Sequence, residues 1–407
     1  MNDSRRDAGW LAASSAIGGV LAYVFFAGAT RALGPDDAAP VSVLWTWWGL
    51  TAAAITFPLQ HWITRDVAAR GGFAGVRALL SVLSLLAVAV AVVGGAATWL
   101  LGEPLFGSRS PAFPALVALV TLGSAVMGLL RGALSSRRRF RALGSTLLAE
   151  NGVRCLCVFA LVATGVEEPA AYGAAIVVGH LSAFVWTSAL ALPRTGEPPA
   201  RSGLGLLLGA AGGQLLAQLV LTGGPVVLAL LGGAPSEVTA LFVGLAIYRA
   251  PYIVAVGVVP QATGVLTTLV LERRHDQLRR VRRVLVAVTL AVTAAAVPVG
   301  LWVGPPLVRL VFGGEVVLDR WVSAMLAAGS VLAVANLVAA VLAIVHARSH
   351  ASTTAWLAGV VVAAPLLFTG LGEDVRIGAW FLAVESVAFA VLLLSVRTAR
   401  GLRVAAP

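Results

Sequence analysis

Twelve apolar segments, each long enough to cross a lipid bilayer, follow one another along this chain of 407 residues. The hydrocarbon core of a bilayer is about 30 Å thick, and an α-helix crosses it in about 20 residues. Hydrophobic residues make up 59% of the chain and charged residues only 12%, against about 25% charged in an ordinary soluble domain. The sequence therefore excludes a water-soluble globule and predicts an all-α polytopic membrane protein.

Polar breaks separate the predicted helices, and no break exceeds about twenty residues. This leaves no room for a soluble catalytic domain on either side of the membrane. The first apolar segment spans the bilayer, so we expect it to remain as a helix and not to be cleaved as a signal peptide. The twelve helices are predicted near 8–29, 40–62, 76–101, 113–134, 145–165, 170–192, 204–231, 238–263, 283–304, 321–346, 352–370 and 377–396.

Arginine is distributed unevenly between the loops on the two sides of the membrane. Cytoplasmic loops retain basic residues because moving them through hydrocarbon is costly. With a cytoplasmic N terminus, 22 arginines fall inside, five outside, and two, Arg154 and Arg249, within the membrane. This pattern predicts a plasma-membrane protein with both termini in the cytoplasm. It also assigns the net charge of +11 to membrane topology, with no nucleic acid as partner.

Short motifs recur in the two halves of the chain, including Pro58 with Pro260 and Gly102 with Gly304, both 202 residues apart. Chance matches in loops rich in glycine and proline are the alternative explanation. Six helices per half give both halves the same membrane orientation, so the repeat is predicted to be parallel. The predicted parts are an N-terminal six-helix lobe (1–192), a cytoplasmic linker (193–203), a C-terminal six-helix lobe (204–396) and a cytoplasmic tail (397–407).

Arg249, Glu150 and Arg154 lie inside predicted helices, where ionisable side chains are rare. Arg249 precedes Pro251 in the eighth helix, more than ten residues from either end, and is expected to face the interior of the bundle. Its role is either substrate contact or pairing with a neighbouring helix. Glu150 and Arg154 are four residues apart in the order that favours an intrahelical pair. They form either a structural pair or an anion-binding arginine held by a carboxylate.

Further polar residues are scattered over other predicted helices and together indicate a wet interior. The default role of each is a hydrogen bond from helix to helix. Glu385 is the better candidate for a protonatable, ion-coupling group, and His180 is a second one. The remaining candidates for a polar cavity are Gln214, Gln218, Gln261 and Asn336.

The stretch from Arg131 to Arg154 contains Arg-Gly, Arg-Phe, and then Glu and Arg four residues apart. It resembles the fourth and fifth helices of Wzx-type polysaccharide flippases of the multidrug/oligosaccharidyl-lipid/polysaccharide (MOP) exporter superfamily. ALGPDD after the first helix, Arg249-Ala250-Pro251, and VRLVFGGE before the tenth helix extend the resemblance over nearly the whole chain. The first helix departs from it, because it carries no charge between Trp10 and Ala29, unlike the lipid II flippases.

The resemblance implies two six-helix lobes that open alternately to each side and flip a polyprenyl-diphosphate-linked saccharide to the outer leaflet. The expected partners are this substrate, the phospholipid bilayer, and glycosyltransferases or a polymerase of the same pathway. Arg249 looks like a cavity cation of the superfamily. Two alternatives are a cation-coupled drug exporter similar to the multidrug and toxic compound extrusion (MATE) transporters, and a membrane-embedded glycosyltransferase or polymerase. The sequence shows no metal-ligand spacing, Walker loop or nucleophile motif, so we predict no metal, no cofactor and no enzymatic activity.

Overall fold

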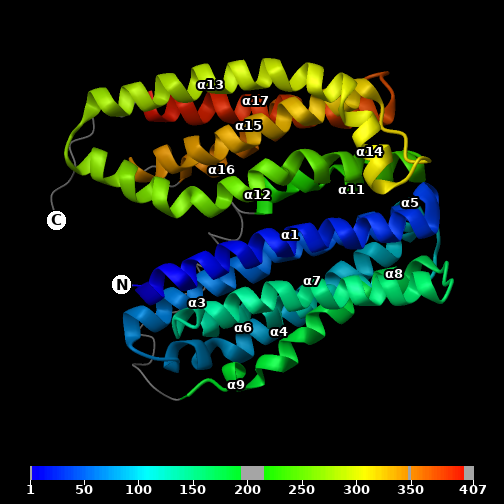
Figure 1. Ribbon diagram of the computed structural model, residues 1–407, viewed down its shortest axis with the longest axis horizontal. Coiled ribbons are helices and arrows are strands. Elements are labelled where there is room, and N and C mark those ends of the chain that lie inside the picture. Colours follow the sequence, from blue (N-terminus) through cyan, green and yellow to red (C-terminus); the bar gives the residue numbers. More distant parts are fainter. Residues whose placement is uncertain (1, 194–214, 347–349, 398–407) are drawn as a thin grey trace. The chain divides into compact units, whose positions relative to one another are not determined.

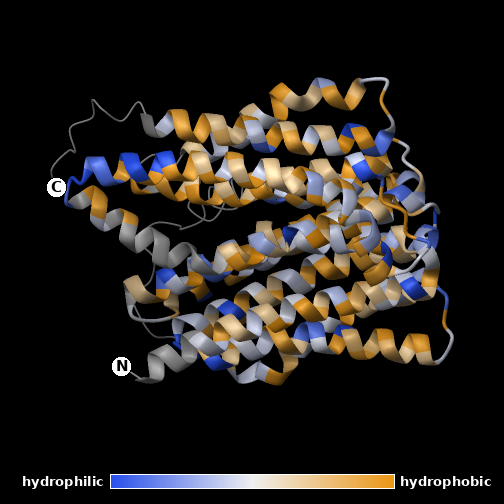
Figure 2. Cartoon of the chain, turned by 45° about the horizontal axis from the view of Figure 1, so that its top comes forward, coloured by the Kyte–Doolittle hydropathy of each residue, from blue (hydrophilic) through white to orange (hydrophobic). Residues whose placement is uncertain are grey.

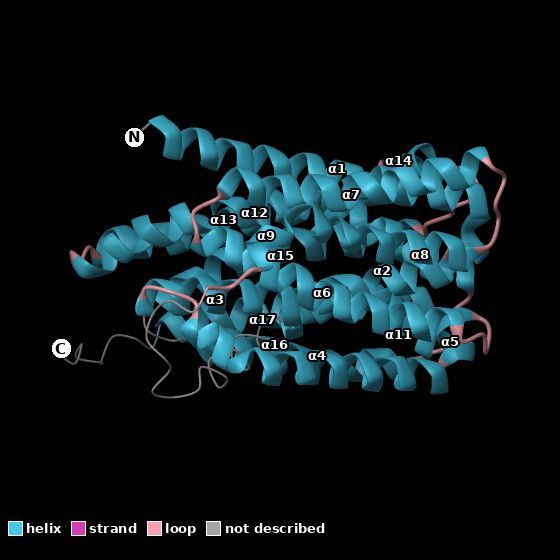
Figure 3. Cartoon of the chain, turned by 90° about the horizontal axis from the view of Figure 1, so that it is seen from below, coloured by secondary structure: helices cyan, strands magenta, loops and turns pink. Residues whose placement is uncertain are grey.

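A computed structural model describes residues 2–193, 215–346 and 350–397, and within these residues helices joined by loops are the only regular elements (Figures 1 and 3). The elements of the first half are α1 (Asn2–Asp37), α2 (Ala39–Thr51), η1 (Ala52–Thr56), α3 (Phe57–Arg70), α4 (Ala74–Leu100), α5 (Gly102–Phe106), α6 (Ala112–Ser136), α7 (Phe140–Ala163), α8 (Pro169–His180), η2 (Leu181–Trp186) and α9 (Thr187–Leu190). Those of the second half are α11 (Gly224–Leu230), α12 (Pro235–Leu271), α13 (His275–Trp302), α14 (Gly304–Phe312), α15 (Arg320–Val345), α16 (His350–Ala363), η3 (Ala364–Phe368) and α17 (Glu373–Arg397).

Ten helices of the described residues are long and apolar enough to span a membrane, and each coincides with one of the twelve predicted segments. The predicted segment 40–62 is helical as well, over α2, η1 and α3. The segment 204–231 begins outside the described residues. Several boundaries were wrong. The helix predicted to end at 263 continues to Leu271, and the helix predicted to begin at 283 begins at His275, because the arginine-rich run there forms the first turns of α13.

The chain divides into two compact units. The first contains Met1–Gln218, Pro225–Thr239 and Val311–Val316, and the second contains Leu219–Gly224, Ala240–Leu310 and Val317–Pro407. In the first unit α1 packs along α7, while α3 and α4 pack against α6. In the second unit α15 packs against α13 and α17, and α16 packs against α17.

A π-helical turn interrupts the second membrane-crossing segment just before Pro58. Proline has no N–H, so the carbonyl one turn earlier loses its helical partner, and a widened turn is one way to accommodate this. The turn places Thr51 Oγ1 2.9 Å from Ser124 Oγ and lets Thr56 Oγ1 donate to Ser124 O at 2.8 Å. These bonds connect the distorted segment to α6.

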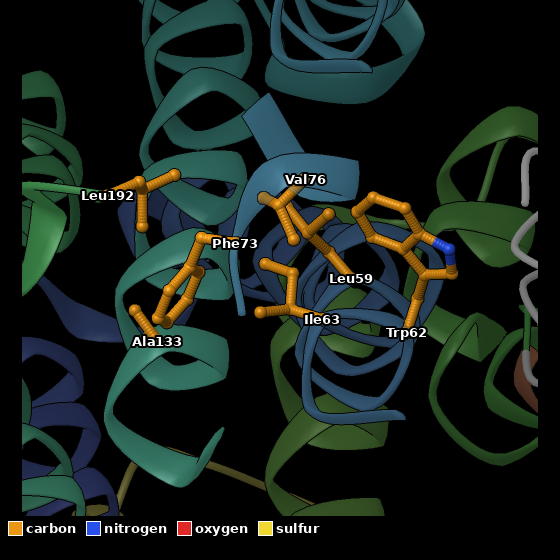
Figure 4. Packing of buried hydrophobic residues seen from close by; sticks show 7 residues of the cluster. All are labelled: Leu59, Trp62, Ile63, Phe73, Val76, Ala133 and Leu192. Atoms are coloured by element: carbon orange, nitrogen blue, oxygen red, sulfur yellow. The ribbon is translucent and has the colours of Figure 1, made fainter. Parts of the chain in front are cut away.

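The cytoplasmic loops predicted from the arginine clusters lie close to a small apolar cluster of α3, α4 and α6, shown in Figure 4. Arg77 Nη1 donates to Leu192 O at 2.7 Å, and Arg137 Nη2 donates to Ala191 O at 2.8 Å. Arg137 also lies over the ring of Phe73. The last described residues before the predicted linker are thus held by arginines and by packing. The cluster consists of Leu59, Trp62, Ile63, Phe73, Val76, Ala133 and Leu192.

Two segments from the second half of the sequence belong to the first unit, where they contact the end of α1. Phe312 is fully buried and packs edge-on against Phe26, with 6.5 Å between ring centroids. Arg31 Nε donates to Val311 O at 3.1 Å, and Thr239 Oγ1 donates to Pro35 O at 2.7 Å. Gly34 allows the end of α1 to make these contacts. Its φ of 77° turns the chain, and residues other than glycine rarely adopt this backbone conformation. We call these contacts the α1 clasp.

Apolar side chains face outward along α4 and α13, which is the distribution that lipid requires. Leu85, Val93 and Leu100 on α4 are exposed, as are Val288, Leu290 and Trp302 on α13. Figure 2 shows hydrophobic residues along most of the length of the helices.

Within the second unit, Tyr248 Oη lies 2.7 Å from Ser323 Oγ, which donates to Gly300 O at 2.7 Å, so α12, α13 and α15 share one hydrogen-bond chain.

Both halves follow a long helix with a short one that begins at a glycine: α5 begins at Gly102 and α14 at Gly304. This element order agrees with the register of the predicted repeat. The superposition of the two lobes stays a prediction, and the predicted linker lies outside the described residues except for Pro193.

Candidate functional site

Glu150 on α7 is the centre of a buried ionic network in the first unit. Its Oε2 accepts a hydrogen bond from Arg131 Nη2 at 2.6 Å, and its Oε1 accepts one from Arg154 Nη2 at 2.5 Å. Glu150 is 2% exposed and Arg154 is fully buried. Charged groups removed from water need such close partners, because desolvation of an unpaired ion costs several kcal/mol.

The remaining donors of the two guanidinium groups are directed at neighbouring helices. Arg154 Nη1 donates to Asn151 Oδ1 at 3.2 Å, and Arg154 Nε donates to Ile176 O on α8 at 3.2 Å. Arg131 Nε donates to Thr146 Oγ1 at 3.3 Å. The network therefore ties α6, α7 and α8 together through named bonds.

Two contacts show how closely the helices fit around Arg154. A Cβ at Gly179 would lie 2.5 Å from Arg154 Nε, so only glycine leaves room for the guanidinium beneath α8. On the side of α2, Arg154 Cζ is 4.4 Å from the ring centroid of Trp48 and 5.4 Å from that of Trp45. Aromatic faces attract a cation at such distances, and the attraction grows when water is excluded.

His180 lies at the edge of this network, with Nε2 3.7 Å from Glu150 Oε1. Gly123 on α6 leaves the space for its ring. With a neutral histidine, the network has two guanidinium groups and one carboxylate, hence a formal charge of +1. This buried network thus carries an excess of positive charge.

A second polar group lies in the second unit, where Asn336 of α15 meets Glu385 of α17. Asn336 Nδ2 donates to Glu385 Oε2 at 2.7 Å and to the backbone oxygen of Glu385 at 2.9 Å. Glu385 is fully buried and Asn336 is 1% exposed. Glu385 Oε1 and Asn336 Oδ1 are buried and have no hydrogen-bond partner among the described residues.

Arg249 lies on α12 in the second unit, three residues before Tyr252, and both side chains are half-buried. Tyr252 is within electrostatic range of both Arg249 and Glu385. The phenol of Tyr252 is therefore near a cation and, separately, near a buried carboxyl group of this unit.

The structure brings the predicted residues into two groups. Glu150, Arg154 and His180 share one network, and Asn336 and Glu385 share the other. Gln218 is half-buried at the edge of the first unit. Gln214 lies outside the described residues, and Gln261 belongs to α12 with a side chain outside the described part.

Arg131 was counted among the arginines of the cytoplasmic side and was missed as a partner of Glu150; it is 6% exposed inside α6 and donates to Glu150. The sequence contained a signal for this contact. Because α6 and α7 are antiparallel around a turn at Arg137–Arg139, Arg131 lies opposite Thr146. The long side chain of Arg131 then reaches Glu150, one helical turn further along α7. Trp45, Trp48 and Tyr252 were also missed as neighbours of charged groups, and no local pattern distinguishes them from packing residues.

No protein-family model matches the sequence, and no curated protein matches it. Solved structures match over nearly the full length. The inward-facing structure of a multidrug resistance MATE family transporter of the MOP superfamily matches with a TM-score of 0.64 and 16% identity, covering 96% of this chain and 93% of that chain. The chain has the fold of MATE transporters of the MOP superfamily.

Two further solved structures support the same fold. A MATE in complex with MaL6 has a TM-score of 0.61 and 14% identity, covering 97% of this chain and 95% of that chain. A MOP superfamily transporter from Pyrococcus furiosus, described as having a binding pocket of reverse polarity that suggests a different function, has a TM-score of 0.56 and 14% identity, covering 97% and 94%. The predicted fold class is thereby confirmed.

Proposed function

We propose that this MATE-fold chain is a membrane transporter that flips a polyprenyl-diphosphate-linked saccharide from the inner to the outer leaflet. A diphosphate and its sugars cannot cross hydrocarbon unaided, because removing them from water without polar partners is costly. A polar, positively charged path supplies those partners while the polyprenyl tail stays in lipid. The cation proposed to contact the diphosphate is Arg249, and the further candidates from the sequence are Gln214, Gln218 and Gln261.

The excess of buried positive charge is the observation that carries this proposal. Glu150 is matched by two arginines, Arg131 and Arg154, so it offers no free anionic charge to a cationic drug. Arg249 adds a third cation on α12. The Pyrococcus furiosus transporter shows that pocket polarity varies among proteins of this fold. In this proposal Arg249 contacts the diphosphate.

Drug export is the second candidate, because the solved neighbours include multidrug resistance transporters and because Glu385 is a buried carboxyl group in the second unit. A cationic compound or a coupling cation would require that group to be ionised. The two functions therefore predict opposite charge requirements for the substrate.

Leaflet-resolved labelling of the lipid-linked saccharide in a deletion strain tests the proposal. We expect the intermediate to be complete but confined to the cytoplasmic leaflet, and surface polymer to be lost. Wild type and Arg249→Lys should restore outer-leaflet lipid better than a normally expressed Arg249→Ala. Normal surface polymer with reduced resistance to toxic compounds would favour drug export, and an intermediate one sugar short would favour an enzyme.

A further inference from the structure

The start of α13 presents an exposed basic face. Arg279, Arg280 and Arg283 are all exposed, and Arg283 follows the other two by four and three residues. Side chains at these spacings are neighbours on a helix surface, so the three guanidinium groups can reach one ligand. On the opposite face of the helix, Leu278 is buried in an apolar cluster with residues of α12 and α15. The arginines therefore point away from the core of the second unit.

The nearby carboxylates leave most of this charge uncompensated. Asp276 Oδ1 lies 3.9 Å from Arg279 Nη1, and this pair is exposed, so it contributes little. Glu272 pairs with another residue, Arg274, at 2.6 Å. Arg280 and Arg283 form no ion pair with a described residue. The basic face of α13 is thus available to an anionic partner from outside the chain.

The same face of α13 becomes apolar where the arginines end. The uncharged part of the helix runs from Val284 to Trp302, and at 1.5 Å per residue it is about 28 Å long, close to the roughly 30 Å of a hydrocarbon core. Val284 is 52% exposed and Leu290 is 64% exposed. The arginines therefore lie within about two helical turns of the hydrocarbon boundary, at the level of the lipid phosphates.

The corresponding helix of the first half shows that spanning a membrane does not require this basic face. At the repeat offset of 202 residues, Arg280 and Arg283 correspond to Ala78 and Ser81 on α4, which are also exposed. Arg77 is the only basic residue of α4, and it donates to a backbone oxygen at 2.7 Å. Because α4 is equally apolar without such a face, the exposed arginines of α13 are a separate feature.

We propose that this basic face binds an anionic phospholipid of the bilayer. Its phosphate lies among Arg279, Arg280 and Arg283, and an acyl chain follows the exposed apolar side chains that come next on α13. A guanidinium group suits this ligand, because it can donate two parallel hydrogen bonds to phosphate oxygens. Basic residues beside a membrane are also attracted to an anionic leaflet.

The continuity of the basic and apolar parts is what selects a lipid as the ligand. A nucleic acid or an acidic peptide would pair with the arginines but would leave the adjoining apolar surface without a partner. A phospholipid has an anionic head joined to an apolar chain, in the order in which α13 presents the two surfaces. The site lies on the lipid-facing side of α13 and does not depend on which substrate is transported.

Quenching of a fluorophore by brominated lipid tests the site in the full-length protein in nanodiscs. The fluorophore bimane is attached to Val288→Cys, one turn beyond Val284, with Cys155 and Cys157 replaced by alanine. Leu86→Cys, at the offset of 202 residues on α4, is the matched control, and both positions are exposed. We expect brominated phosphatidylglycerol to quench position 288 several-fold more than brominated phosphatidylcholine does. Position 86 should show no such preference.

Replacing the arginines tests their role, and glutamine keeps much of each exposed side chain. The triple variant Arg279→Gln, Arg280→Gln and Arg283→Gln should lose the preference at position 288. The control variant Arg138→Gln, Arg139→Gln and Arg141→Gln removes the same charge from the exposed start of α7 and should keep it. The comparison of positions 288 and 86 needs neither variant.

Three results would overturn the proposal. Equal quenching of position 288 by the two lipids would show that the face does not select an anionic headgroup. Loss of the preference in both triple variants would attribute it to net charge and not to α13. Farnesyl diphosphate, a short polyprenyl diphosphate, would identify the face as a site for lipid diphosphates if it abolished the preference at a concentration where unlabelled phosphatidylglycerol did not.

Discussion

Arg131 and Glu150, on adjacent antiparallel helices, are joined by a 2.6 Å hydrogen bond between Nη2 and Oε2, and Glu150 neutralises Arg154 with its other oxygen. One carboxylate therefore serves two arginines in the interior of the first unit. Breaking a buried ion pair costs far more than the pair contributes, because a charge is left uncompensated.

Glu150→Gln should therefore destabilise the protein strongly. An amide keeps the shape but leaves two guanidinium groups without a counter-charge, and we expect a loss of about 3–5 kcal/mol in the free energy of unfolding. Unfolding in mixed micelles measures it. Glu103→Gln is the control, because its pair with Arg109 is exposed and should contribute little. A Glu150→Gln protein as stable as the control would show that the network is not needed for the fold.

Gly179→Ala should also be destabilising, by about 1–3 kcal/mol, because overpacking forces neighbours to move. The added Cβ would meet Arg154 Nε at 2.5 Å. Gly152→Ala on α7 is the matched control, since a Cβ there has nothing within 4 Å. Alanine favours a helix interior by about 1 kcal/mol over glycine, so the control should be neutral or stabilising. Equal effects at both positions would contradict the contact with Arg154.

The α1 clasp should protect Val316 but not its neighbour Val317 from an aqueous thiol reagent. Val316 is 1% exposed and Val317 is 62% exposed. We expect a membrane-impermeant maleimide applied to intact cells to label Val317→Cys quickly and Val316→Cys slowly, in a background where Cys155 and Cys157 are alanine. Arg31→Ala removes the bond to Val311 O and should speed labelling at 316 several-fold.

The same experiment checks the predicted topology. Labelling of Val317→Cys only after cell lysis would place this loop in the cytoplasm and contradict the topology predicted from the arginine distribution. Indifference of the 316 label to Arg31→Ala would show that the clasp does not depend on that bond.

Tyr248 and Ser323 should be energetically coupled. Ser323 Oγ bonds both Tyr248 Oη and Gly300 O, so removing it leaves a partly buried phenol and a buried carbonyl oxygen short of a partner. Residues in one hydrogen-bond network show interaction energies of about 0.5–3 kcal/mol. We expect Tyr248→Phe and Ser323→Ala together to cost less than the sum of the two single substitutions, measured by unfolding. Strict additivity would mean that the bond does not contribute to stability.

The sequence by itself determined the class of structure and most of its helices. A spanning helix satisfies its own backbone groups within about 20 apolar residues, so local composition suffices to locate it. The arginine distribution likewise predicts topology, because it depends on the cost of moving each loop through lipid and not on packing. The pair of Glu150 and Arg154 could also be predicted from the sequence, because their spacing is that of one helical turn.

Only the tertiary structure decided which partners those residues have. Arg131 joins Glu150, and Trp45 and Trp48 cover Arg154, because α2, α6 and α7 meet there; no periodicity within one helix records such a meeting. Asn336 and Glu385 are 49 residues apart and become a pair only through the packing of α15 on α17. Contacts between helices depend on the shapes of the side chains where the helices cross. The role of a small residue such as Gly179 can be recognised only once the neighbouring side chain, here Arg154, is known.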